Sequence, residues 1–161
     1  MTRTDRTTEA SHPTHGSTAT RSTGSVRLAA SPDAAPRVRE WVCAELRRAD
    51  WPASCRADAA LAVDEAVQNA VEHGSEPDAE IRVALAVEGD VARIRVRDRG
   101  RPGAAPPTGP LVAPGDDAIR GRGRLIMANL ADVDWQPADG GGTEVRLHIC
   151  ADASAPGDAS N

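Results

Sequence analysis

The chain has 161 residues, of which 40% are hydrophobic, and a formal net charge of -5 at pH 7. This length fits one domain. Its acidic balance argues against a small DNA-binding regulator, because affinity for a phosphate backbone comes largely from clustered Lys and Arg. No apolar run approaches the roughly 20 residues that cross a bilayer, and the N-terminus lacks the apolar block of a signal peptide. We therefore expect a soluble cytoplasmic protein that contacts neither nucleic acid nor membrane.

The potential metal-binding side chains are scattered. The three cysteines, Cys43, Cys55 and Cys150, show neither close-paired ligand spacing nor a disulfide framework, and the four histidines form no pattern with them. We expect reduced, structural cysteines and no zinc site.

Both ends of the chain differ in composition from the middle. Residues 1–24 are rich in Thr, Ser and charged side chains and contain almost no large apolar residue, and residues 151–161 are similar. Such segments bury too little apolar surface to offset the entropy of ordering. The sequence therefore predicts disordered tails at 1–24 and 151–161 around one folded domain at 25–150.

Hydrophobic periodicity places the elements in chain order. Period-two and period-3.6 patterns predict a strand, two helices, a hairpin, a third helix and a closing hairpin, at Ser25–Ala30, Ala34–Arg48, Ala53–His73, Ile81–Val87 with Val91–Val96, Arg124–Leu130, and Val133–Gln136 with Thr143–Ile149. Between them, Gly100–Gly121 is rich in Gly, Pro and Ala, and a loop this long is usually functional or disordered. The predicted fold class is an α/β two-layer sandwich (α+β), with helices on one face of a mainly antiparallel mixed sheet.

Two polar residues of the second predicted helix are spaced to face one ligand. Glu65 and Asn69 are four residues apart, which puts them one above the other on a helix while the apolar residues point away. An amide oxygen suits a hard cation such as Mg²⁺, and a carboxylate can accept a hydroxyl proton. The alternative is a solvated helix face, and this segment alone does not decide between the two.

Three further motifs follow. Asp98 ends an apolar strand just before Gly100, where a carboxylate can accept a hydrogen bond from a base amine and the glycine admits a close approach. Gly121-Arg122-Gly123 begins a helix, whose free N–H groups favour a phosphate. Gly142-Thr143 enters the last strand, where the hydroxyl can hydrogen-bond a base. Taken singly, each is more often an ordinary turn or loop.

In this order, the four motifs resemble those of the GHKL (Bergerat-fold) ATPases. Glu65-Ala66-Val67-Gln68-Asn69-Ala70-Val71-Glu72-His73-Gly74 is similar to the N box, Asp98-Arg99-Gly100-Arg101-Pro102 to the next box, Gly121-Arg122-Gly123 to the glycine box and Gly142-Thr143 to the final box. The resemblance spans 25–149. Pro102 at the end of the second box, the compact length, and the Leu125-Ile126-Met127 helix followed by Leu130-Ala131-Asp132 resemble the anti-sigma serine-kinase branch.

The resemblance implies a Bergerat-type fold that binds Mg-ATP under a lid at 103–120. It implies roles for the site residues: Glu65 as general base, Asn69 as Mg²⁺ ligand, Asp98 as adenine reader supported by Thr143, Gly100 lining the base pocket, and Gly121, Arg122 and Gly123 at the phosphates. Two positions depart from the family pattern, Arg124 where an apolar residue is common and Ile119 where some members carry Arg.

The resemblance also implies partners. They are a sigma factor, which the protein sequesters, and a STAS-type anti-anti-sigma protein, which it phosphorylates on serine; a homodimer fits the same resemblance. The alternative is a non-catalytic, ATP-dependent protein-binding module. Both functions need Asp98 and the glycine box, but only the kinase needs Glu65 as a base.

Overall fold

The computed structural model describes residues 21–101 and 122–151. Gly121, the expected lid at 103–120, residues 1–20 of the expected N-terminal tail and residues 152–161 lie outside the described residues. The described elements are, in chain order, β1 (Arg21–Ala29), α1 (Ala34–Arg48), α2 (Ala53–Asn69), the π-helical turn η1 (Ala70–Gly74), β2 (Glu80–Glu88), β3 (Val91–Arg97), α3 (Arg122–Leu130), β4 (Asp132–Pro137) and β5 (Thr143–Cys150).

The five strands form one sheet in the order β1-β2-β3-β5-β4. Every neighbouring pair is antiparallel, and both predicted hairpins, β2 with β3 and β4 with β5, are confirmed by their register. The parallel pairing among the described residues is an isolated bridge between Ser75 and Gly100. The predicted α+β class is confirmed.

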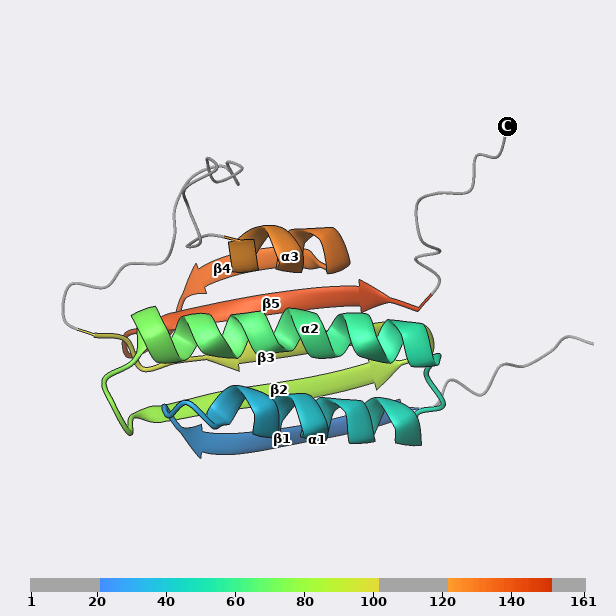
Figure 1. Ribbon diagram of the computed structural model, residues 1–161, viewed down its shortest axis with the longest axis horizontal. Helices are drawn as coiled ribbons and strands as arrows, with labels where there is room; N and C mark the ends of the chain where they lie inside the picture. The colour runs from blue at the N-terminus through green and yellow to red at the C-terminus, as the bar shows by residue number, and fades with distance from the viewer. Residues whose placement is uncertain (1–20, 102–121, 152–161) are drawn as a thin grey trace, which may run out of the picture.

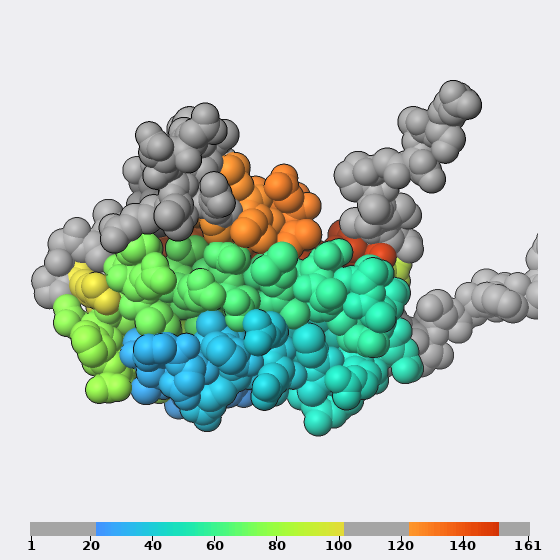
Figure 2. All heavy atoms as spheres, viewed as in Figure 1, coloured from blue at the N-terminus to red at the C-terminus, as the bar shows by residue number. Residues whose placement is uncertain are grey.

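The three helices cover one face of the sheet (Figure 1). Strand β2 alternates buried and exposed residues along its length, as expected for a sheet with one covered face. From the helix side, the atoms of α1 and α2 lie next to each other over the sheet, with α3 beside them (Figure 2). The core between the two layers is aliphatic, and its largest fully buried side chains include Leu46, Ile81, Ile94, Met127 and Leu147.

Most element boundaries lie within two residues of the prediction, but the start of the first strand and the end of the second helix differ by four. Strand β1 begins at Arg21, inside the expected tail, because residues 21–24 continue the ladder with β2, from Arg21 opposite Glu88 to Gly24 opposite Leu85. The second helix is α-helical only to Asn69, and its last five residues form η1. Side-chain periodicity does not distinguish an α-turn from a π-turn. The packing of the helix end decides which of the two forms.

No helix in the described ranges 21–101 and 122–151 is long and apolar enough to cross a membrane.

Candidate functional site

Asp98 is held by the backbone at the end of β3. Its carboxylate Oδ1 accepts hydrogen bonds from the backbone N–H of Gly100 at 2.7 Å and of Thr143 at 3.0 Å. The backbone N–H of Asp98 in turn donates to the carbonyl of Thr143 at 3.0 Å. Only 4% of the residue is exposed. The carboxylate is thus nearly removed from solvent and fixed in direction by two donors, one of them 45 positions away in sequence.

The second oxygen of the same carboxylate faces the end of helix α2. A Cβ on Gly74, the last residue of η1, would overlap Oδ2 of Asp98. Only a residue without a side chain can occupy this position while Asp98 keeps its place. Helix α2 continues into η1, and this helical segment therefore meets the end of β3 where Gly74 contacts Asp98.

Arg101 joins the same two segments. Its Nη2 donates to the carbonyl of Val71 at 3.1 Å, and its Nε donates to the carbonyl of Ser75. These two carbonyls flank Gly74 on either side in sequence. Beside them runs the bridge between Ser75 and Gly100.

Glu65 lies next to the start of helix α3. A Cβ on Gly123, in the first turn of α3, would overlap Oε2 of Glu65 and come within 3.3 Å of its Cδ. The carboxylate therefore faces the helix end at which backbone N–H groups have no partner within the helix. Helices α2 and α3 pack together along this contact.

Asn69 ends the α-helical part of α2, one turn after Glu65. Its Nδ2 is buried and has no hydrogen-bond partner among the described residues. The two ends of an amide exchange places by a flip about one bond, so the same buried position suits a carbonyl oxygen. An orphaned polar atom at this place is expected where a ligand completes the site.

The pKa of both carboxylates is raised, chiefly by burial, and only the smaller influences differ between them. Burial raises the pKa of Asp98 above its usual range, and the N–H groups of Thr143 and Gly100 act in the opposite direction. Burial also raises the pKa of Glu65, and the negative charges of Asp64 and Glu72 add to this. Perturbed carboxyl groups of this kind are common at functional sites.

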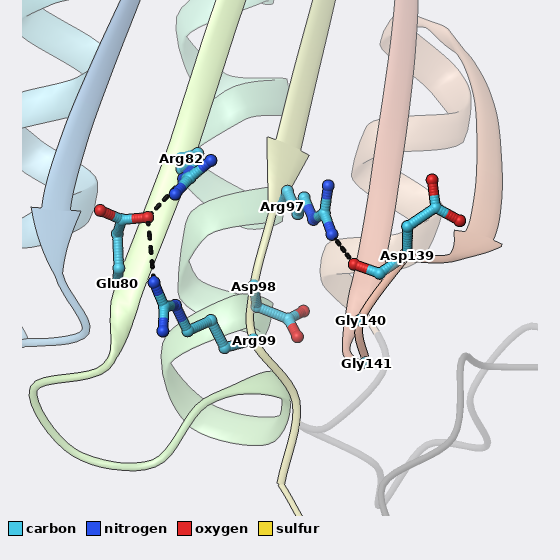
Figure 3. Close-up of a pocket in the computed structure, with 8 residues that line it drawn as sticks. All are labelled: Glu80, Arg82, Arg97, Asp98, Arg99, Asp139, Gly140 and Gly141. Carbon is cyan, nitrogen blue, oxygen red and sulfur yellow. Dashed lines mark hydrogen bonds and ion pairs between the residues drawn. The ribbon is translucent and has the colours of Figure 1, made fainter.

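A cavity of about 230 Å³ opens where β2 begins and β3 ends, beside the turn between β4 and β5 (Figure 3). Ion pairs and hydrogen bonds span it: Glu80 pairs with Arg82 and Arg99, and Arg97 donates to the carbonyl of Asp139. Asp98 also lines the cavity, whereas Glu65 and Asn69 are not among its described lining residues. Its three arginines and Glu80 already have partners, so we take the contact of Asp98 with the helical segment as the candidate functional site instead.

The structure thus brings most of the sequence-predicted residues together at one end of the two layers. Thr143 contributes its backbone N–H, Gly100 its N–H, and Gly123 its close approach to Glu65. Arg122 is the first residue of α3, and Gly121 lies outside the described residues. Sequence reasoning missed two participants, the contact of Gly74 with Asp98 and the hydrogen bonds of Arg101. Both residues belong to the quoted motifs. Their contacts are with residues distant in sequence, so only the tertiary structure identifies their role.

Arg124, which departs from the family pattern, has its own packing partner. Its guanidinium lies 5.7 Å from the ring centroid of Trp135 on β4. This distance permits a cation–π interaction, which accommodates a charged residue at a position that is commonly apolar.

The described residues contain no group of three or more His, Cys, Asp or Glu side chains that could hold a metal ion. A magnesium ion bound alongside phosphates needs fewer protein ligands than this, because it keeps several waters and takes phosphate oxygens. The amide oxygen of Asn69 is one of the ligand types that such an ion takes.

Comparison with known proteins identifies similar chains. Residues 28–149 match the family described as the histidine kinase-like ATPase domain. Among solved structures, the chain is similar to the crystal structure of the RsbU and RsbW domains of Rv1364c from Mycobacterium tuberculosis, with 28% sequence identity and a TM-score of 0.60. That similarity covers 80% of this chain and 32% of the other, so this chain spans about a third of its length. No curated protein matches the chain significantly.

Proposed function

Because the chain belongs to the histidine kinase-like ATPase family, whose membership implies ATP binding, we propose that it is an anti-sigma regulatory kinase. In this proposal it sequesters a sigma factor and phosphorylates a serine of a STAS-type anti-anti-sigma protein. The similarity to the RsbU and RsbW domains supports a role among protein partners of a partner-switching system.

The observation that carries the proposal is the environment of Asp98. A buried carboxylate whose Oδ1 is occupied by two backbone donors keeps Oδ2 as an acceptor of fixed direction. The exocyclic amine of adenine can donate a hydrogen bond to such an oxygen. A guanine presents a carbonyl at the corresponding position, which the carboxylate would repel. We therefore assign adenine recognition to Asp98, with Gly100 and Thr143 holding it.

The phosphates belong near the start of α3 in this proposal. Free N–H groups at a helix start favour anions, and Gly123 brings this helix end to Glu65. Asn69 would hold Mg²⁺ through its amide oxygen, and the ion would neutralise phosphate charge when bound. The feature that supports this assignment is the buried terminal atom of the Asn69 amide, Nδ2 as placed, which has no hydrogen-bond partner among the described residues.

Glu65 has the chemical role of general base. It accepts the proton of the substrate serine as the hydroxyl oxygen forms a bond to the γ-phosphorus, and the bond from that phosphorus to the bridging oxygen of ADP breaks. A base works best when its pKa approaches the working pH. Burial and the neighbouring Asp64 and Glu72, which raise the pKa of Glu65, move it in that direction.

Separate substitutions distinguish chemistry from binding. Glu65→Gln removes the base but keeps the size of the side chain, so we expect near-normal Mg-ATP binding and a loss of phosphotransfer by about two to four decades. Asn69→Ala should weaken ATP binding only when Mg²⁺ is present.

The measurements are calorimetry with ATP, and transfer of labelled phosphate to STAS-type proteins of the same cell. Glu88→Gln, at an exposed position in β2, is the matched control.

Two results would contradict this assignment. Phosphotransfer at the original rate by the Glu65→Gln variant would exclude Glu65 as the base. If the unmodified protein binds ATP and captures a sigma factor but phosphorylates no STAS-type protein, the non-catalytic binding module replaces the kinase.

A further inference from the structure

The side chain of Arg101 ties η1, which continues helix α2, to the segment after β3, beside the backbone bridge between Ser75 and Gly100. Arg101 donates from Nη2 to the carbonyl of Val71 at 3.1 Å and from Nε to the carbonyl of Ser75. Between those carbonyls in sequence lies Gly74, which leaves no room for a Cβ beside Asp98. One guanidinium therefore holds both sides of the residue that contacts the carboxylate.

The chemistry of a helix end explains why an arginine suits this position. The last carbonyls of a helix have no partner within it, and here the final turn is the π-helical η1. A guanidinium offers several N–H donors in one rigid plane, so it can serve two carbonyls at once, whereas the ammonium of Lys is a single point on a flexible stem. Arg101 thus satisfies backbone groups of one motif from within another.

We propose that Arg101 is a positioning residue for base recognition: by holding the carbonyls of Val71 and Ser75, it keeps Gly74 against Asp98. The same clamp keeps η1, and through it the preceding Asn69, at a fixed offset from Asp98. The part of this inference that concerns nucleotide rests on the proposed function. Arg101 need not touch the ligand, because it acts through the backbone of η1.

The first experiment is calorimetry of ATP and of adenosine with Arg101→Ala and Arg101→Lys. We expect Arg101→Ala to weaken both ligands by about tenfold, since both use the base pocket, and Arg101→Lys to restore part of the loss. Arg95→Ala removes an exposed arginine from β3 and should bind as the unmodified protein does. Unchanged affinity in Arg101→Ala, or weakening of ATP without weakening of adenosine, would overturn the proposal.

The second experiment needs no ligand. The carboxyl of Asp98 is titrated by carbon NMR in the unmodified protein and in both variants. Burial raises its pKa, while the N–H groups of Thr143 and Gly100 and the charge of Arg97 lower it. Release of Gly74 admits water, so the pKa of Asp98 should fall in Arg101→Ala and recover partly in Arg101→Lys. A pKa unchanged in Arg101→Ala would contradict the clamp.

The two experiments separate the inference from the function on which it rests. If the unmodified protein fails to bind ATP but the titration of Asp98 shifts in Arg101→Ala, the proposed function is wrong and the clamp stands. If ATP binds but neither affinity nor titration changes in that variant, the clamp is wrong and the proposed function stands.

Discussion

At the scale of single residues, the proposed site contains two carboxylates in different surroundings. Asp98 is almost fully buried and accepts two backbone N–H groups, whereas Glu65 is partly exposed and has two acidic neighbours. The carboxylate of Asp98 is suited to present a hydrogen-bond acceptor to a base in a fixed orientation. The carboxylate of Glu65 has a proton affinity increased by its environment and is suited to take up a proton.

The raised pKa of Glu65 predicts the acid side of the pH profile of phosphotransfer. Only the ionised carboxylate accepts a proton, so activity should rise with pH through a pKa above that of an ordinary Glu. The carboxyl's contribution to stability has the opposite sense: because its folded pKa is raised, it favours folding at low pH, and this is lost as pH rises through that pKa.

The measurement is the pH dependence of kcat/KM with Glu72→Gln as a comparison. Removing the charge of Glu72, one of the three causes of the raised pKa, should move the acid limb to lower pH. An acid limb that stays in place when Glu72 is neutralised would show that another group controls it.

At the scale of elements, the turn between β4 and β5 packs against the backbone of Asp98 through Gly142. Gly142 has a φ of +87°, and a Cβ there would overlap the carbonyl of Asp98. Two effects therefore act against a side chain at this position, a left-handed backbone and a direct overlap with the site.

Gly142→Ala should accordingly lower the free energy of unfolding by more than Gly140→Ala. Gly140 has a similar φ of +84°, but a Cβ there meets nothing within 4 Å. The control should cost about 1–3 kcal/mol from backbone strain alone, and Gly142→Ala should cost more and also weaken ATP binding. Urea denaturation of both variants measures the difference; equal losses would mean that the turn moves away from Asp98 without penalty.

At the scale of the whole molecule, the site joins both layers, so nucleotide binding should stabilise the complete fold. Glu65 and Asn69 come from the helical layer, and Asp98 and Thr143 come from the sheet. A ligand bound only by the folded state at 100 times its Kd adds about 2.7 kcal/mol to the free energy of unfolding. Thermal or urea unfolding with and without Mg-ATP measures this gain.

Asp98→Asn tests whether the increase in the free energy of unfolding with ATP depends on base recognition. Replacing the acceptor by an amide removes a hydrogen bond to a charged group, which costs about 1.5–3 kcal/mol, or about one to two decades of affinity. At the same ATP concentration the gain should then fall to about 0.4–1.4 kcal/mol. Asp132→Asn, an exposed change on β4, is the control. A full gain in Asp98→Asn would exclude this carboxylate as the base acceptor.

The sequence by itself determined the element types, both hairpins and the fold class, because hydrophobic periodicity and turn residues act over a few neighbouring positions. The spacing of Glu65 and Asn69 belongs to the same local information, since one helical turn relates them. The alternation of β2 and β3 likewise requires a sheet with one covered face.

Only the tertiary structure decided how distant motifs meet. The pairing of β3 with β5 brings Thr143 to Asp98, and the packing of α3 on α2 brings Gly123 to Glu65. The π-turn after Asn69 and the hydrogen bonds of Arg101 to it also depend on contacts between segments far apart in sequence. Local patterns carry no record of these contacts, because chain connectivity constrains near neighbours, whereas the alignment of remote segments follows from how the two layers pack.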